Sequence, residues 1–365
     1  MTARQVPMPP GGRRPRMVDV ARRAGVSRAL VSLVLSGKPG ASPANRAKVL
    51  SAAAELGYAP DVNARRLREG TRRLVGVVFD GHDAFTARVL DAAHEAVAAR
   101  GRDLVLTMSS SAPSSASSAS VRLVRALRTL EAQRVSGILL ISSGPVDAEA
   151  AALLSTVPAV FVGAYAPAHL AGRVASVHSD DEGGMRCLVR HLVDLGHRRM
   201  AVTRVAGRRS GDLRAQAVVD EARLLGAEVL EVPAAAYDES AGVAAGREVL
   251  GALDLDPAPT AVLAANDALA LGIIHVLRGQ GLRVPEDVSV TGFDDAGAGP
   301  APAVASLGLT TVHQDVEGLI SSALDLLEAP PRPGEAAELV LPTRLVLRST
   351  TAAPAVPGST DPMPS

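Results

Sequence analysis

One face of an expected helix near the N-terminus carries side chains suited to contacting DNA bases. In VDVARRAGVSRALVSLVLSG, residues 18–37, the apolar residues Val31 and Val34 are interspersed at helical spacing with polar and small ones. An arginine, a hydroxyl and small apolar groups on one exposed face can meet base edges in the major groove. A generic amphipathic hairpin would show the same periodicity, so both interpretations stay open. The residues expected on the DNA-facing side are Arg28, Ala29, Ser32 and Leu33.

The elements that must position this face form a small three-helix unit. Gly25 permits a tight turn after the first helix, and Ser27 can cap the second. The following segment, SPANRAKVLSAAAELGYAP, predicts a third helix with Ser42 as its cap and Pro43 at its first position. Together these signals predict a helix-turn-helix with a third packing helix over residues 17–60.

The charge of the chain is distributed unevenly. Residues 1–73 contain 15 Lys or Arg and four acidic residues, whereas the whole chain contains 38 of each sign. Residues 74–365 therefore carry 23 basic and 34 acidic groups. A basic head of this kind supplies the phosphate contacts that drive association with nucleic acid. A solubilising tail is the alternative that charge alone leaves open.

From residue 74 the pattern changes to apolar strand segments that alternate with amphipathic helices. The alternation runs from LVGVVF to AVFVG and restarts after Gly196 with RMAVTRV. It predicts parallel strands joined by crossover helices, in two lobes of similar construction. The low-complexity segment SSSAPSSASSAS, residues 109–120, predicts a flexible surface loop. The expected fold class is an all-α helix-turn-helix head plus an α/β body of two doubly wound parallel-sheet lobes.

Catalysis, metal binding and membrane insertion find little support in the sequence. Asp294 and Asp295 are adjacent carboxylates, but neighbours on a strand point to opposite faces and would not share a substrate. None of the eight histidines has tight metal-ligand spacing, and the single cysteine, Cys187, is expected to pack in an apolar helix face. No apolar run reaches the roughly 18 residues of a membrane-spanning helix, and no signal peptide is apparent. We expect a cytoplasmic protein with no catalytic residue, metal or cofactor.

The motifs AGVS, VLSG, LGYAP and NARRLREG follow one another in this order and precede the strand LVGVVF. This ordered set, over residues 17–79, resembles the head, hinge and first strand of the LacI/GalR (lactose-repressor/galactose-repressor) family of transcriptional regulators. The body, roughly 74–349, resembles the periplasmic-binding-protein-like sensor of that family, for instance in PTAVLAANDALALG and LRVPEDVSVTGFDD. The resemblance covers nearly the whole chain, and it implies a transcriptional regulator, with repression as the expected output, whose DNA affinity a small molecule controls.

The resemblance implies how the head would meet DNA. Arg28 and Ala29 match the two leading base-contact positions, with Ser27 beside them. Leu33 stands where the family usually has an arginine, and leucine offers only apolar contact, for instance to a thymine methyl. The operator is therefore expected to differ from the family's commonest half-site.

The resemblance also implies a role for the hinge. In the family this segment becomes a helix on DNA and inserts a leucine into the minor groove, and the matching residue here is Leu67. Such a wedge costs unstacking energy, which contacts from neighbours such as Asn63 and Arg66 would offset. A core leucine in a short linker helix is the alternative.

A small-molecule site is implied in the cleft between the two lobes. Carboxylates and amides there would exchange hydrogen bonds with ligand hydroxyls, and Arg214 could make a forked contact. For each residue alone a helix-capping or strand-end role is a comparable alternative, most clearly for Asp267. A sugar is the leading effector class; a nucleoside, an organic acid or no ligand are alternatives. The implied effector residues are Asp83, Phe85, Asp180, Asp181, Arg214, Asn266, Asp294 and Gln314.

These expectations define domains, partners and competing functions. We expect a homodimer on double-stranded DNA with a near-palindromic operator, because two-fold symmetry demands matching half-sites. A higher assembly is left open, and so are two other functions: a solute-binding protein, and a DNA binder whose body does not sense.

The expected domains are a disordered basic arm (1–16), the helix-turn-helix (17–60), the hinge (61–73), the effector-binding and dimerisation domain (74–350) and a disordered tail (351–365). Lobe 1 is expected at about 74–197 plus 311–330, and lobe 2 at about 198–310 plus 337–350.

Overall fold

The computed structural model describes residues 15–35, 39–58, 74–81, 83–110, 116–141, 144–295, 303–330 and 338–355. The chain divides into two compact units, residues 1–72 and 73–365. The expected hinge, and with it Asn63, Arg66 and Leu67, lies outside the described residues, so its role stays a prediction.

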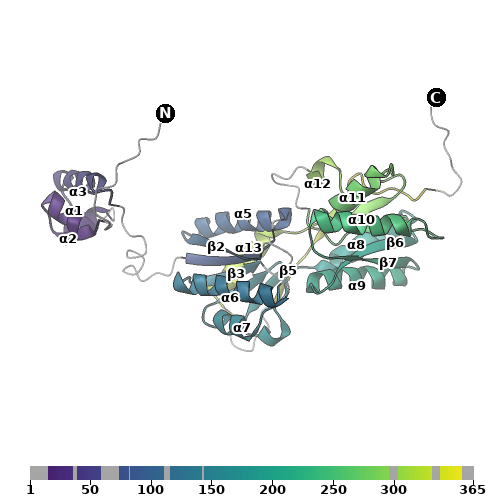
Figure 1. Cartoon of the computed structure of the whole chain (residues 1–365), viewed down its shortest axis with the longest axis horizontal. Coiled ribbons are helices and arrows are strands. Elements are labelled where there is room, and N and C mark those ends of the chain that lie inside the picture. The colour runs from purple at the N-terminus through teal and green to yellow at the C-terminus, as the bar shows by residue number, and fades with distance from the viewer. Residues whose placement is uncertain are drawn as a thin grey trace, which may run out of the picture. The chain divides into compact units, whose positions relative to one another are not determined.

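The described residues of the N-terminal unit, 15–35 and 39–58, form three short helices (Figure 1). Gly25 adopts a left-handed conformation, φ +65°, which ends the first helix and lets the chain turn into the second. The predicted caps are confirmed, because Ser27 accepts a hydrogen bond from the Leu30 amide at 3.2 Å and Ser42 accepts one from the Asn45 amide at 3.3 Å. The helices are α1 (Met17–Ala24), α2 (Arg28–Leu35) and α3 (Pro43–Glu55). Their buried core consists of Val20, Ala21, Val31, Val34, Val49, Ala52 and Ala53.

The first lobe of the body is a parallel six-stranded sheet between two layers of helices (Figure 1). The strand order is β11-β5-β4-β3-β1-β2, and one core lies under α5 and α13 while a second lies under α6 and α7. The strands are β1 (Leu74–Asp80), β2 (Asp103–Ser110), β3 (Gly137–Ile141), β4 (Ala159–Val162), β5 (Ala175–Ser179) and β11 (Glu338–Leu341). The helices are α5 (Ala84–Ala99), α6 (Ala116–Ala132), α7 (Ala148–Leu154), a short 3-10 helix (Ala168–Leu170) and α13 (Val316–Glu328).

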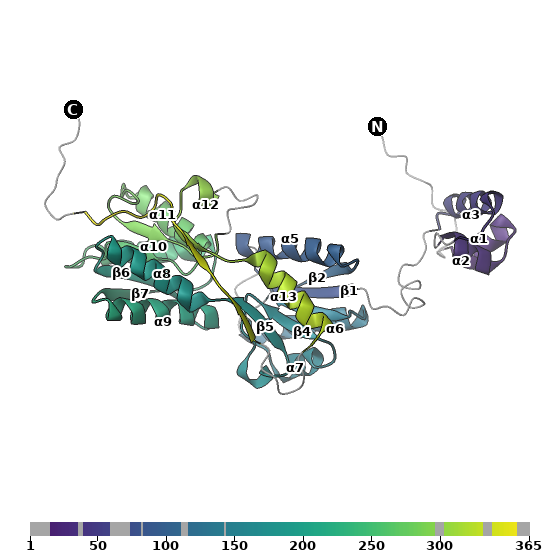
Figure 2. The ribbon, with the colours of Figure 1, turned by 180° about the vertical axis from the view of Figure 1, so that it is seen from behind.

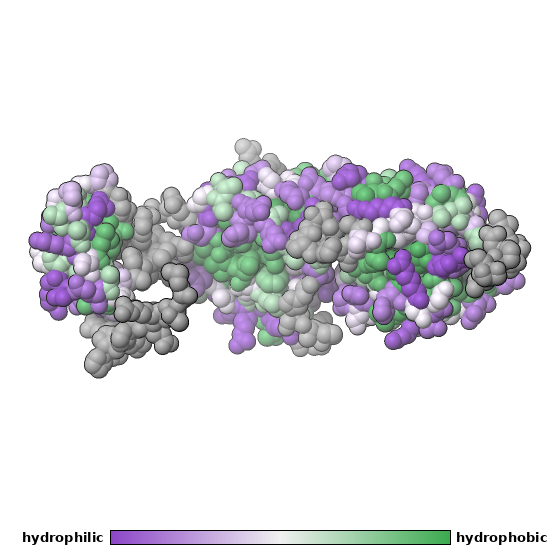
Figure 3. All heavy atoms as spheres, turned by 90° about the horizontal axis from the view of Figure 1, so that it is seen from above, coloured by the Kyte–Doolittle hydropathy of each residue, from purple (hydrophilic) through white to green (hydrophobic). Residues whose placement is uncertain are grey.

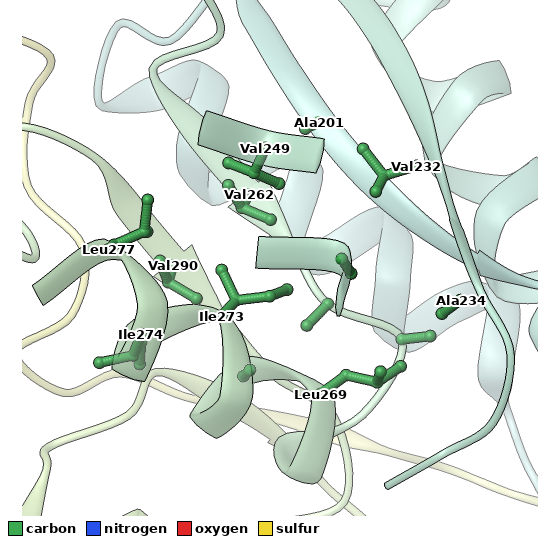
Figure 4. Packing of buried hydrophobic residues seen from close by; sticks show 14 of the residues in the cluster. Ala201, Val232, Ala234, Val249, Val262, Leu269, Ile273, Ile274, Leu277 and Val290 are labelled. Atoms are coloured by element: carbon green, nitrogen blue, oxygen red, sulfur yellow. The ribbon is translucent and has the colours of Figure 1, made fainter. Parts of the chain in front are cut away.

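The second lobe repeats this construction on a smaller parallel sheet of order β7-β6-β8-β9. Helices α10 and α11 cover one face, whose aliphatic core Figure 4 shows, and α8 and α9 cover the other. The strands are β6 (Arg199–Val205), β7 (Glu228–Ala234), β8 (Ala261–Leu263) and β9 (Ser289–Thr291). The helices are α8 (Asp181–Asp194), α9 (Arg209–Leu224), α10 (Glu239–Ala252), α11 (Asp267–Gly279) and α12 (Ala303–Ser306). The predicted fold class is thereby confirmed.

The chain passes between the lobes three times. It crosses after β5, between β10 (Thr311–His313) and α13, and between β11 and β12 (Arg344–Val346). Strands β10 and β12 pair antiparallel, with Val312 opposite Leu345. Figure 2 shows these late segments running from one lobe to the other. The crossings bring residues far apart in the sequence to one junction.

Two predicted lobe boundaries differ from the structure. Helix α8 was expected in lobe 1, but its buried residues, including Met185 and Leu192, pack with Met200 and Val218 of lobe 2. The chain therefore crosses near residue 180 instead of 197. Strand β11 was expected in lobe 2, but it pairs with β5 of lobe 1. An amphipathic pattern shows which side of an element is buried and not which sheet covers it, which explains both errors.

Three smaller expectations also need correction. The predicted tail begins too early, because the carbonyl of Ala352 lies 2.9 Å from Nε2 of His197, so the chain at this point packs on lobe 2. The predicted loop 109–120 is partly regular, because β2 extends to Ser110 and α6 begins at Ala116. Cys187 is exposed on α8 and does not pack in the core.

Candidate DNA and effector sites

The second helix of the head presents part of the predicted DNA-contacting face to solvent. Ser27, Arg28 and Ala29 are exposed, whereas Ser32 and Leu33 are half-buried. A Cβ placed on Gly40 would lie 3.5 Å from the Leu33 side chain, so Leu33 borders the loop that follows α2. Arg28, exposed at the first position of α2, places a positive charge at the start of this face.

At the junction of the two lobes, Arg214 on α9 is the centre of a buried polar cluster. Its Nε donates to Oδ1 of Asp181 at 2.8 Å, and its Nη2 lies 2.7 Å from the same oxygen. Nη1 donates to the carbonyl of Ala265 at 2.7 Å and lies 3.7 Å from Asp294. The guanidinium also lies over the ring of Phe293, 3.8 Å from its centre. Burial alone would lower the pKa of Arg214, but the carboxylates of Asp181 and Asp294 outweigh it and raise that pKa.

Asp294 is a second buried carboxyl group of this cluster. Its side chain is 6% exposed, and its Oδ1 accepts a hydrogen bond from Nε2 of Gln314 at 2.6 Å. Burial raises the pKa of Asp294 well above its ordinary value; Arg214 partly offsets this, while the carboxylates of Asp267 and Asp83 add to it. When it is protonated, this carboxyl group can donate a hydrogen bond to a ligand as well as accept one.

Tyr165, in the loop after β4, completes the cluster from the first lobe. Its hydroxyl donates to Oδ2 of Asp181 at 2.9 Å, so both oxygens of that carboxylate are engaged. Burial, together with the nearby Asp181 carboxylate, raises the pKa of Tyr165, which keeps its hydroxyl protonated as a donor. The fold brings Tyr165 beside Asp181, from which it is 16 residues away in the sequence.

The structure thus brings Asp181, Arg214, Asp294 and Gln314 together, and it gives several other predicted effector residues local partners. Asp83 caps α5 through the Thr86 amide, and Asp180 caps α8 through the Gly183 amide, each at 2.8 Å. The capping of α11 expected of Asp267 is made by its neighbour Asn266, whose Oδ1 accepts from the Leu269 amide at 2.9 Å.

Two of these side chains have further neighbours. The Asn266 amide nitrogen donates to the carbonyl of Tyr237 at 3.1 Å. Phe85 is half-buried, and a Cβ placed on Gly163 would lie 3.4 Å from its ring. Asn266 therefore joins the start of α11 to the segment after β7, and Phe85 borders the turn after β4.

Asp294 and its neighbour Asp295 face different surroundings, although not through the strand alternation expected from the sequence, because β9 ends at Thr291 before either residue. The side chain of Asp295 lies 2.6 Å from Nη2 of Arg348 and 3.0 Å from Nδ1 of His313. Both aspartates have positive φ, 117° and 49°. The two carboxyl groups therefore contact different partners, Gln314 for Asp294 and Arg348 with His313 for Asp295.

Metal-ligating clusters and membrane-spanning helices are both absent from the part of the chain that the structure describes. No group of three or more His, Cys, Asp or Glu arranged to hold a metal ion occurs among them. In the same part of the chain, no helix is long and apolar enough to cross a membrane. A shallow groove of about 560 Å³ runs along α6 from Val121 to Gln133, and none of the predicted effector residues lines it.

Comparison with known proteins agrees with the two-part organisation. Residues 16–61 match the model of bacterial regulatory proteins of the lacI family, and residues 189–351 match a periplasmic binding protein-like domain. The HTH-type transcriptional regulator MalR of Streptomyces coelicolor is 32% identical, over 92% of this chain and 96% of its own. A lac repressor dimer bound to operator and the anti-inducer ONPF has a TM-score of 0.72 at 29% identity, covering 93% of this chain and all of that one. A complex of the regulator CelR with cellobiose has a TM-score of 0.61 at 30% identity, and the match covers 92% of this chain and all of that one.

The helical head and the two-lobed body together define a DNA-binding transcriptional regulator with a periplasmic-binding-protein-like body. The chain belongs to the lacI family of bacterial regulatory proteins, since the similarity to MalR extends over nearly its full length. The resemblance inferred from the ordered motifs of the head and body is confirmed.

Proposed function

We propose that this protein is a cytoplasmic repressor that binds a near-palindromic operator as a homodimer and changes its operator affinity when a small molecule binds between its lobes. The observation that carries the proposal is the buried cluster of Asp181, Arg214, Asp294 and Gln314 at the lobe junction. Buried polar groups that converge where two lobes meet are typical of ligand sites that open and close.

A sugar or related metabolite is the effector class that we propose. The cluster offers carboxyl, amide and guanidinium groups, which suit ligand hydroxyls. A solved relative supports this class, since that structure is a complex of the regulator CelR with the sugar cellobiose. Binding, and not catalysis, is the proposed activity, because the adjacent carboxylates face different partners.

The proposed DNA contacts come from the head and the hinge. Major-groove contacts are assigned to α2, and the minor-groove wedge is assigned to Leu67 with its neighbours. These residues are Ser27, Arg28, Ala29, Ser32 and Leu33 in the head, and Asn63, Arg66 and Leu67 in the hinge.

Dimerisation through the body is supported by apolar surface on the first lobe. Leu106 and Met108 on the edge strand β2 are 50% and 42% exposed. Figure 3 shows apolar surface gathered on this lobe. Large exposed aliphatic side chains of this kind are suited to an interface between subunits.

Binding of the purified full-length protein to its own upstream DNA tests the proposal. It is measured at two salt concentrations, with and without cellobiose, maltose and a set of nucleosides. Specific binding that one compound weakens or strengthens supports a ligand-controlled regulator. Salt-sensitive binding without sequence preference, or specific binding that no compound changes, contradicts it.

The hinge assignment has its own test. The variant Leu67→Ala is expected to weaken specific binding and to leave nonspecific, salt-sensitive binding mostly intact, because the wedge acts only on a correctly docked operator. Equal loss of both kinds of binding would refute the wedge role.

A further inference from the structure

Two consecutive arginines at the start of α9, Arg208 and Arg209, reach from the second lobe to the first. The guanidinium of Arg208 lies 3.6 Å from the carboxylate of Asp80, the last residue of β1. The guanidinium carbon of Arg209 lies 4.8 Å from the ring centre of Tyr165. Both contacts therefore cross the lobe junction from the same end of one helix.

Local helix stability gives no reason for arginines at these positions. The N-terminus of a helix carries partial positive charge, which disfavours cationic side chains there. Arg208 stands at the N-cap of α9 and makes no capping hydrogen bond through its side chain. A carboxylate and an aromatic face on the opposite lobe, however, are both suitable partners for a guanidinium.

The Arg209 contact is continuous with the buried cluster. The ring that it covers belongs to Tyr165, whose hydroxyl donates to Asp181, and Asp181 in turn binds Arg214. Separation of the lobes must therefore break the Arg208 ion pair and the Arg209 contact along with the Tyr165 hydrogen bond.

We propose that Arg208 and Arg209 form an interlobe clasp, which holds the lobes closed before any ligand binds and so sets how readily the junction opens. The side chains of Arg208 and Asp80 are 36% and 18% exposed, so salt screens their attraction in part. A clasp of this strength biases the equilibrium between closed and open lobes without locking it. Its effect on ligand entry rests on the proposed function, whereas closure itself needs neither DNA nor effector.

Single-molecule energy transfer between the lobes of the full-length protein tests the clasp. One dye is attached to native Cys187, exposed on α8, and the other to an E131C variant, exposed on α6. Labelled chains are mixed into excess unlabelled protein so that each assembly holds one labelled pair. The variant R208A/R209A is expected to raise the ratio of open to closed chains about 3-fold to 30-fold, the factor for loss of one exposed ion pair and one cation–π contact.

Two further variants make the result specific. The variant R283A removes an arginine that pairs with Asp287 inside lobe 2, and it should leave the distances between the lobes unchanged. The charge exchange D80R/R208D keeps an oppositely charged pair at these two positions, so the distances between the lobes should stay close to those of the wild type. Unchanged distances in R208A/R209A, or the same opening in R283A, would overturn the clasp. If the variants open the lobes as expected while no ligand changes operator binding, that combination would count against the proposed function and leave the clasp standing.

Discussion

Replacement of Arg214 by methionine isolates the contribution of the buried cluster to stability. The substitution keeps an unbranched side chain and removes the two contacts to Asp181, at 2.7 and 2.8 Å, and the hydrogen bond to Ala265. It leaves Asp181 and Asp294 without their cation, although their side chains are only 5% and 6% exposed. Removal of one partner from a buried ion pair costs about 3–5 kcal/mol. We therefore expect the free energy of unfolding of the body to fall by about that amount.

Urea and thermal unfolding, followed by far-ultraviolet circular dichroism, measure this effect. For a body of this size the loss corresponds to a fall in Tm of roughly 5–10 °C. The control Arg283→Met removes an exposed arginine and should change the free energy by less than about 0.5 kcal/mol.

A double variant shows whether the cost comes from the unpaired charge. Asp181→Asn combined with Arg214→Met should recover about 1–3 kcal/mol relative to the sum of the two single changes, because it removes both charges of the pair. A loss below about 1 kcal/mol in the single variant, or costs that simply add, would refute the assignment of the pair as a coupled buried contact.

Three further predictions concern single groups. Because the pKa of Asp294 is raised, its contribution to stability is full below the ordinary aspartate pKa of about 4 and is lost as pH rises through the folded-state pKa. Lowering the pH from about 8 to about 5 should therefore stabilise the wild type relative to Asp294→Asn in urea unfolding. A stability difference that stays constant with pH would contradict this. Tyr165→Phe should cost about 1 kcal/mol in the same assay, since one hydrogen bond to Asp181 is lost, and an unchanged midpoint would show that the bond contributes nothing. Arg28→Ala should weaken specific operator binding by roughly 10-fold to 100-fold at constant salt, and an equal loss on unrelated DNA would show that Arg28 contacts only phosphates.

Local features of the head could be predicted in detail because each has a local cause. A left-handed turn needs Gly25, and a hydroxyl immediately before a helix caps it, as Ser27 and Ser42 do. These effects act over three or four residues, so the sequence contains all the information that determines them. The half-buried position of Leu33 beside Gly40 depends on packing between segments and could not be predicted in the same way.

The residue types of the effector cluster were predictable, but the pairing among them was not. Motif positions singled out Asp181, Arg214, Asp294 and Gln314 separately, and the structure joins them through contacts between residues 20 to 80 apart in the sequence. The same motif positions also selected Asp83 and Asp180, whose carboxylates cap helices. A carboxylate that follows a strand suits either role, and only its distance to other side chains distinguishes them.

The assignment of α8 to the second lobe changes which contacts a movement of the lobes would break. Because α8 packs with α9, Asp181 and Arg214 belong to the same lobe, and their ion pair can persist when the lobes move. The hydrogen bond from Tyr165 to Asp181 instead joins the two lobes. A boundary at residue 197 would have placed the ion pair across the junction and made it the contact that opening disrupts. With the observed boundary, the contacts that opening disrupts are those of Tyr165 and of the arginines at the start of α9. Substitutions at these residues should alter lobe movement, whereas substitutions in the buried pair should alter the stability of the second lobe.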